Sequence, residues 1–180
     1  MKHDNAFLIA NIWLRRLRPF IDRGEICGSI RRKKPEVKDI ELVLLPKIVT
    51  QTDLFGKASR YRHPEFAETF QDPAMLVVNK GNASRGKYTQ VHIIDHKINM
   101  DVFIANERNY GLIKLIRIGD ADFSRIFIGT ILPRHGYRSE DGLLKEDEKV
   151  IPVNEEEELF NLCRIPFIKP EHRNINAILS

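Results

Sequence analysis

The stretch from Gly28 to Leu45 constrains the fold of this 180-residue chain more than any other. A Gly-Ser turn and two arginines precede a run in which carboxylates and hydrophobic residues alternate, beginning at Asp39 and Glu41. Successive side chains of a strand point to opposite faces, so Asp39 and Glu41 project together while Ile40 enters a core. Two neighbouring carboxylates repel each other unless a cation lies between them, and oxygen ligands suit Mg²⁺. The stretch therefore predicts a metal-binding strand beside a turn whose N–H groups suit an anion.

The composition indicates a chain that folds in water. It is 42% hydrophobic and 30% charged, long enough for one domain or two small ones. No apolar run approaches the roughly 20 residues that span a bilayer, and the polar N-terminus is unlike a signal peptide. Two cysteines, Cys27 and Cys163, argue against a disulfide framework and a structural zinc site. We therefore expect a cytoplasmic protein, or one associated with a nucleoid or virus, that is not secreted. The net charge of +4 is compatible with polyanion binding without requiring it.

Hydrophobic periodicity predicts an α+β fold. Apolar residues recur at helical spacing from Ala6 to Ile21, and Gly24 is the expected terminator. The stretch from Pro46 to Pro73 is irregular apart from a short helix expected around Glu65–Phe70. Further strands are expected at Met75–Asn79, Thr89–Ile94 and Lys97–Ile104. A turn at Asp95-His96 joins the last two strands as a hairpin, and the pattern becomes helical after residue 107. We predict one unit over residues 1–107 and a second over 108–180.

Asp101 is a third candidate ligand, a lone carboxylate in an otherwise apolar strand. Burial of a bare carboxylate is costly. A metal would relieve that cost, and so would a hairpin edge open to water. Because Asp39 and Glu41 already indicate a metal, and a two-metal site needs carboxylates from neighbouring strands, Asp101 is the natural third ligand.

The chain resembles the nucleotidyltransferase superfamily that includes DNA polymerase β, and family X DNA polymerases most closely. The resemblance rests on the Gly-Ser dipeptide, the two arginines, the spacing of eleven residues from Gly28 to Asp39, and the acid-hydrophobic-acid pattern. A second similarity lies in Asn109–Leu112 and Ile116–Asp120, which look like the start of the family X thumb. The resemblance covers nearly the whole chain. It implies a catalytic palm with a mixed β-sheet and flanking helices over residues 1–107, and a small α+β thumb over 108–180.

The resemblance also implies a role for individual residues. Two Mg²⁺ ions, or Mn²⁺, would be held by Asp39, Glu41 and Asp101, the catalytic residues of an in-line nucleotidyl transfer. Nucleotide binding is expected of Gly28, Ser29 and Arg32 on the triphosphate, and of Gly119, Phe123 and Ser124 near the sugar and base. The candidate DNA contacts are Lys80, Arg85, Lys87 and Arg125.

These expectations describe a monomeric DNA-directed DNA polymerase that fills short gaps in DNA repair. Its ligands would be a dNTP and primer-template or gapped DNA. No membrane association is expected, and a protein partner could supply additional affinity for DNA. One alternative is a template-independent nucleotidyltransferase acting on an RNA end, a protein or a small molecule. Another is a non-catalytic nucleic-acid-binding scaffold, against which the three intact acids argue. Glu41 stands where the family usually has Asp, and Ile116–Asp120 departs from the usual family turn, so template dependence and sugar selectivity are open.

Overall fold

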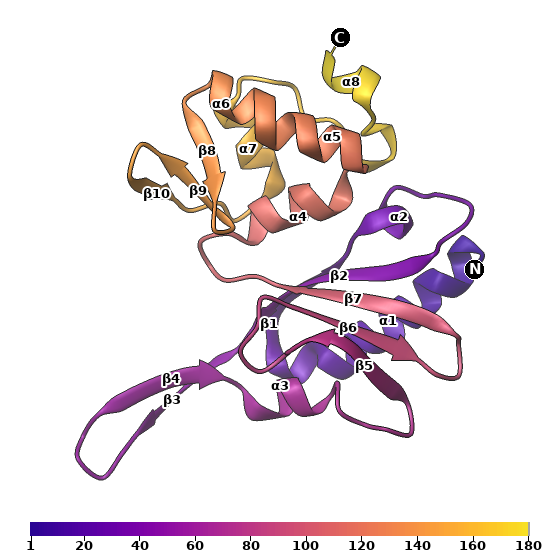
Figure 1. Ribbon diagram of the computed structural model, residues 1–180, viewed down its shortest axis with the longest axis vertical. Helices are drawn as coiled ribbons and strands as arrows, with labels where there is room; N and C mark the ends of the chain where they lie inside the picture. The colour runs from indigo at the N-terminus through magenta and orange to yellow at the C-terminus, as the bar shows by residue number, and fades with distance from the viewer. Residues whose placement is uncertain (180) are drawn as a thin grey trace.

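The computed structural model describes residues 1–179 and has a mixed α+β architecture, as the sequence predicts (Figure 1). The helical segments are α1 (His3–Leu17), η1 (Arg18–Phe20), α2 (Gly28–Arg31), α3 (Pro64–Glu68), α4 (Tyr110–Ile118), α5 (Ala121–Ile126), η2 (Phe127–Ile131), α6 (Leu132–Arg134), α7 (Glu156–Leu162), η3 (Pro170–His172) and α8 (Ile175–Leu179). The strands are β1 (Ile21–Ile26), β2 (Asp39–Pro46), β3 (Ile48–Thr52), β4 (Ala58–Arg62), β5 (Leu76–Gly81), β6 (Tyr88–Ile93), β7 (Ile98–Ile104), β8 (Tyr137–Glu140), β9 (Leu143–Glu146) and β10 (Lys149–Ile151).

A five-stranded sheet with the order β1-β2-β7-β6-β5 forms the first half of the chain. Strands β2 and β7 run parallel, and the other neighbours are antiparallel. One face of the sheet packs against α1 in a core that includes Trp13, Leu42 and Met100. Because side chains alternate along a strand, the odd-numbered residues of β2 and β7 lie on the opposite face. We call this the acid face, since it carries Asp39, Glu41 and Asp101.

The second half has its own core, formed by α4, α5, α7 and the three-stranded sheet β10-β9-β8. Asp120 caps the N-terminus of α5, since its Oδ1 accepts a hydrogen bond from the backbone N–H of Phe123 at 2.7 Å. A third, smaller cluster, with Val43, Tyr110 and Ile118, joins the sheet to α4. The second half therefore packs against the side of the sheet that α1 leaves open (Figure 1).

Two local expectations were wrong. The first helix ends at Leu17, because Pro19, which has no backbone N–H, begins a 3₁₀ turn and β1 follows. Gly24 therefore lies inside a strand instead of ending a helix. The stretch expected to be irregular contains an antiparallel hairpin of β3 and β4, which projects from the body at the lower left of Figure 1. By contrast, the three strands predicted between residues 75 and 104 are present within two residues of their expected bounds.

No helix among residues 1–179 is both long and apolar enough to cross a membrane.

Candidate active site

The parallel pairing of β2 with β7 aligns the predicted acids. Asp39 lies opposite Asn99, and Glu41 lies opposite Asp101. Asp101 is only 9% exposed, and Asp39 and Glu41 are half-buried. Three carboxylates that are far apart in the sequence therefore share one face of two adjacent strands.

Asp101 is held by two neutral donors from β6. Its Oδ1 accepts hydrogen bonds from the Tyr88 hydroxyl at 2.5 Å and from Gln90 Nε2 at 2.8 Å. Sequence reasoning did not name Tyr88 or Gln90 as site residues. The signal was nevertheless present, because a hairpin turn centred on Asp95-His96 pairs Gln90 with Asp101. The hydrogen bonds fix the orientation of the Asp101 carboxylate.

Glu41 extends toward the start of α2. A Cβ atom on Gly28 would lie only 1.6 Å from Glu41 Oε2, and Gly28 has a φ of +60°, which favours glycine. The family resemblance implies that Gly28 lies at the triphosphate of a bound nucleotide. In the structure, the carboxylate of Glu41 occupies the space that a side chain at Gly28 would need.

The carboxylates on the acid face are difficult to ionise together. Burial, followed by the charge of Asp39, raises the pKa of Glu41 to about 7, although Arg32 and Arg117 offset part of the rise. Burial and the charge of Asp101 also raise the pKa of Asp39. Both shifts disfavour the charged form, so a bound cation would relieve the repulsion.

The residue types fit a magnesium site, since all three are hard oxygen donors. Their side chains do not converge, however, and no group of three or more His, Cys, Asp or Glu among residues 1–179 is placed to hold a metal ion. Two contacts explain this: Tyr88 and Gln90 hold Asp101, and Glu41 is directed at Gly28. Binding of a metal would require these carboxylates to turn toward a common point.

The predicted phosphate turn presents donors that lack partners. Ser29 Oγ and Arg32 Nε are buried and make no hydrogen bond. Arg32 Nη1 donates to the carbonyl oxygens of Ile118 and Gly119, both at 2.9 Å. Buried polar groups are normally paired, so the two free donors favour a ligand with acceptor oxygens. Of the predicted nucleotide-binding residues, Gly28, Ser29, Arg32 and Gly119 therefore lie together.

Phe123 and Ser124 lie beside Gly119, where a Cβ atom on the glycine would come within 2.6 Å of each side chain. Phe123 is fully buried in the second core, and the Ser124 hydroxyl donates to the carbonyl of Ile116 at 3.0 Å. In this arrangement both side chains are buried against the turn between α4 and α5, and their contact with a nucleotide stays a prediction. Arg125, a predicted DNA contact, is exposed and pairs with Asp122 at 3.1 Å.

A cavity of about 590 Å³ opens between the acid face and the second half of the chain. Its lining includes Glu41 and Asp101, together with Lys87, one of the predicted DNA contacts. Lys87 Nζ donates to the carbonyl of Asp141 at 2.9 Å. Arg117 also lines the cavity, and its guanidinium lies 3.9 Å from the centre of the Phe103 ring. Sequence reasoning missed Arg117, since only the tertiary structure brings α4 over β7.

The other two predicted DNA contacts lie on the first half of the chain. Lys80, at the end of β5, pairs with Gln90 in the sheet register, and Arg85 belongs to the loop between β5 and β6. Both side chains are exposed. They belong to β5, the edge strand of the five-stranded sheet, and to the loop that follows it, so they are on the same half as the acids, whereas Arg125 is on the second half.

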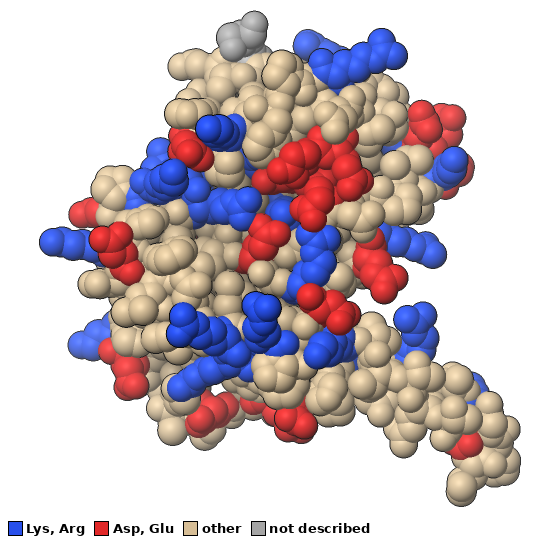
Figure 2. Space-filling view, turned by 180° about the vertical axis from the view of Figure 1, so that it is seen from behind, with Lys and Arg blue, Asp and Glu red and all other residues tan. Residues whose placement is uncertain are grey.

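A second group of charges lies between the two halves, where acidic and basic side chains alternate (Figure 2). We call it the ion-pair chain, and its members in order are Arg23, Glu155, Lys114, Glu25, Arg31, Glu156 and Arg173. The buried Lys114 Nζ lies 2.7 Å from Glu25 and 2.9 Å from Glu155. At the other end, Arg173 lies 2.6 Å from Glu156, and both side chains are fully buried. Each carboxylate in the chain faces at least one cation.

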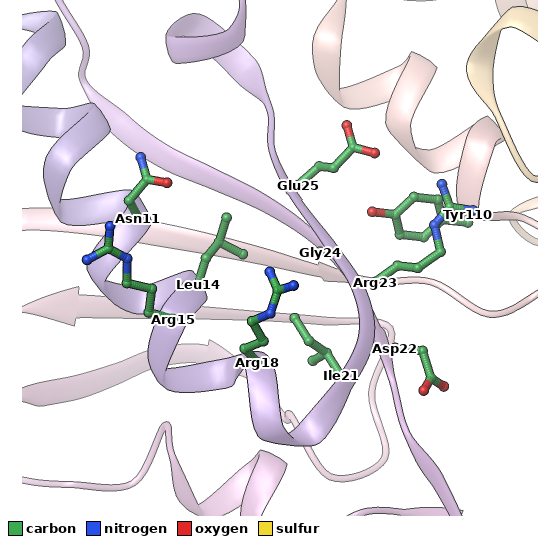
Figure 3. Close-up of a pocket in the computed structure, with 10 residues that line it drawn as sticks. All are labelled: Asn11, Leu14, Arg15, Arg18, Ile21, Asp22, Arg23, Gly24, Glu25 and Tyr110. Carbon is green, nitrogen blue, oxygen red and sulfur yellow. The ribbon is translucent and has the colours of Figure 1, made fainter.

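Arg23 and Tyr110 form the outer end of this junction. Arg23 reaches from β1 toward the ring of Tyr110, with 4.0 Å between the guanidinium and the ring centre (Figure 3). Arg23 also pairs with Glu155. These side chains border a hollow of about 530 Å³ beside β1. The contacts tie β1 to the start of α7.

Comparison with known protein families gives no match, and comparison with curated proteins finds no significantly similar sequence. The similarity to family X polymerases therefore depends on the motif residues named above.

Proposed function

We propose that this chain is a family X-type nucleotidyltransferase that adds deoxynucleotides to a primer 3′-hydroxyl. The observation that carries the proposal is the register of β2 and β7, which sets Glu41 opposite Asp101 with Asp39 on the same face. Beside these acids, Ser29 and Arg32 provide buried donors without partners. Nucleotidyl transfer requires carboxylates that bind metal ions and, beside them, hydrogen-bond donors that bind the phosphate oxygens.

Each group of side chains has a separate role in the proposed reaction. Mg²⁺ ions on Asp39, Glu41 and Asp101 would lower the pKa of the attacking hydroxyl and neutralise the triphosphate. Ser29 and Arg32 would donate hydrogen bonds to phosphate oxygens, and a guanidinium forms strong charge-assisted bonds of this kind. Tyr88 and Gln90 hold Oδ1 of Asp101, and these hydrogen bonds would have to adjust as the carboxylate turns toward a metal.

A second candidate is template-independent transfer to another acceptor. It is favoured by the burial of Phe123 and Ser124, because these side chains are unable to touch a nascent base pair in this arrangement. The metal and phosphate residues would act in the same way. The two candidates differ in whether the nucleotide is selected by a template.

Primer extension on a one-nucleotide-gapped DNA duplex, with each dNTP supplied separately in Mg²⁺, tests both candidates. We expect addition of the templated nucleotide, and a loss of roughly a hundredfold or more in Asp101→Asn, the scale of removing one preorganised electrostatic group. Asp95→Asn is the matched control, because Asp95 lies in the exposed turn of the same hairpin.

The results of primer extension distinguish the polymerase from terminal transfer and from a binding role. Addition of every nucleotide regardless of template, still lost in Asp101→Asn, would replace the polymerase by terminal transfer. Equal activity of Asp101→Asn and the control would show that the acid face is not the site. A lack of transfer to DNA or RNA acceptors with either Mg²⁺ or Mn²⁺ would rule out the polymerase and transfer to an RNA end, and would leave a protein or small-molecule acceptor or a binding role.

A further inference from the structure

The hairpin of β3 and β4, residues 48–62, is the most projecting part of the molecule, and we call it the ribbon (Figure 1). Its tip exposes two large apolar side chains: Leu54 is 101% exposed and Phe55 is 95% exposed. The Asp53 carboxylate accepts hydrogen bonds from the backbone N–H groups of Phe55 and Lys57, both at 2.9 Å, which shapes the turn. An ordered turn therefore presents Leu54 and Phe55 directly to solvent.

One face of the ribbon is basic. In the register, Thr50 pairs with Arg60 and Ile48 pairs with Arg62, so these four side chains share a face. No carboxylate lies on this face, because Asp53, the one acid of the ribbon, belongs to the turn. The face therefore offers guanidinium and hydroxyl donors to an anion.

The base of the ribbon is fixed to the body. Arg62 Nη1 donates to the carbonyl oxygens of Ala83 and Gly86, at 2.9 and 2.6 Å. Arg60 and Arg62 line a hollow of about 580 Å³ together with Arg108, and the carboxylates of Asp22 and Glu107 also border it. Arginines from two segments thus contribute to the same concave surface.

This hollow adjoins the candidate active site. Ala105 and Leu143 line the hollow, whereas Ile104 and Gly142, their neighbours in the sequence, line the cavity that contains Glu41 and Asp101. The cavity and the hollow are therefore separated only by the connection from β7 to α4 and the turn from β8 to β9. The basic face of the ribbon, which borders the hollow, is therefore close to the cavity across this part of the chain.

We infer that the ribbon is a second DNA contact, in which Phe55 and Leu54 stack on or between bases while Arg60 and Arg108 bind phosphates. The inference rests on the proposed function in that the DNA is the one whose end lies at the acid face. Apolar wedges and aromatic platforms are established ways of gripping nucleic acid. Two apolar residues on a narrow tip are far too small for the core of a stable protein interface, which buries more than roughly 1,000 Å². The basic face above the hollow also favours a polyanion.

Fluorescence anisotropy with labelled gapped DNA in EDTA measures this contact without catalysis. We expect the double variant Leu54→Ser/Phe55→Ser to bind about fivefold to tenfold more weakly, within the range of losing a stacked base. Leu8→Ser is the matched control, since Leu8 is another exposed apolar residue, 62% exposed on α1. Arg60→Ala should reduce the slope of log affinity against log salt by about 0.9, the release expected for one phosphate contact. Arg134→Ala, an exposed arginine of α6, should leave that slope unchanged.

A tryptophan at the tip reports stacking directly. Trp13 is the only tryptophan of the chain and is buried, so Phe55→Trp adds an exposed fluorophore. We expect DNA to quench it, because bases stack on aromatic rings. No quenching, with equal DNA affinity of the tip variant and the wild type, would overturn the inference. Tip-dependent self-association in sedimentation, with unchanged DNA affinity, would overturn it in favour of a second copy of the chain.

The two proposals can fail separately. If primer extension fails while the tip variant still weakens DNA binding, the ribbon contact stands and the catalytic proposal falls. If extension succeeds and the tip variant binds DNA like the wild type, the ribbon inference alone is wrong.

Discussion

The ion-pair chain and the acid face are two groups of partly buried charges on the same side of the sheet, and their charges are arranged in opposite ways. In the ion-pair chain, Glu25 contacts both Arg31 at 2.5 Å and Lys114 at 2.7 Å. On the acid face, Asp101 has neutral hydrogen-bond donors, and its nearest charged neighbours on the strands are further carboxylates, Asp39 and Glu41. Every carboxylate of the ion-pair chain is paired with a cation of the protein, whereas the carboxylates of the acid face give an excess of negative charge.

The difference indicates what each region contributes. Opposite charges in contact offset part of their desolvation cost, and removing one partner leaves the other uncompensated. Like charges at close range raise one another's pKa values and lower stability. The ion-pair chain therefore holds the two halves together, whereas repulsion between the carboxylates of the acid face lowers stability, and under the proposed function a cation would relieve that repulsion. Substitutions in the two regions should accordingly change stability with opposite signs.

The largest effect is expected at the inner end of the ion-pair chain. Arg173→Met removes the main partner of the fully buried Glu156. Because Arg31 lies 3.7 Å from Glu156 and compensates it poorly, we expect a loss of about 3–5 kcal/mol in the free energy of unfolding. Urea denaturation followed by circular dichroism measures the loss.

The double variant Arg173→Met/Glu156→Leu serves as the control, since removing both charges should restore most of the stability. If Arg173→Met alone unfolds with the midpoint of the wild type, the ion-pair chain does not stabilise the junction.

A smaller effect of opposite sign is expected on the acid face. Glu41→Gln removes one of the repelling charges, so the metal-free protein should gain about 1 kcal/mol in the free energy of unfolding at pH 8, after allowance for partial exposure. Mg²⁺ should raise the Tm of the wild type, because it binds the folded state, and should raise that of Glu41→Gln much less. Differential scanning calorimetry with Mg²⁺ or EDTA gives both quantities. Lower stability of the metal-free variant, or an equal Mg²⁺ response, would contradict the contrast between the regions.

The smallest effect is a difference in pH dependence. Although burial raises the pKa of Glu155, hydrogen bonds and charges from Lys114 and Arg23 lower it overall, below its ordinary value of 4.5. Its contribution to stability is therefore present above pH 4.5 and lost as the pH falls through the lowered pKa. Glu41, with its pKa raised to about 7, favours the folded state below pH 4.5 and loses that contribution as the pH rises through 7.

Unfolding free energies measured from pH 3 to 8 distinguish the two carboxyls. Glu155→Gln should be less stable than the wild type by up to about 1 kcal/mol at pH 7, with the gap closing in acid, because the pair is partly exposed. Glu41→Gln should match the wild type in the free energy of unfolding below pH 4.5 and become the more stable of the two as the pH rises from 4.5 to 8. If the free energies of unfolding of Glu155→Gln and Glu41→Gln changed with pH in the same way, the contrast between the surroundings of Glu155 and Glu41 would be wrong.

The sequence determined the main strands and the identity of the acids. Alternation of apolar and polar residues placed Asp39 and Glu41 on one face because side chains along a strand have a period of two, whatever surrounds it. The same regularity, with a turn at Asp95-His96, contained the pairing of Gln90 with Asp101. The cap at Asp120 is also local, since it depends on residues within one helical turn.

Other features were decided only by the tertiary structure. The parallel register sets Glu41 opposite Asp101, a residue far away in the sequence, and no local pattern specifies this pairing. The use of Phe123 in a core, and of Arg32 to hold the carbonyls of Ile118 and Gly119, depends on how the second half packs over the sheet. The ribbon escaped prediction because its side chains are mostly polar and exposed on both faces, so no hydrophobic alternation marks its strands. Local periodicity thus fixes which side chains share a strand face, whereas long-range packing fixes which faces meet.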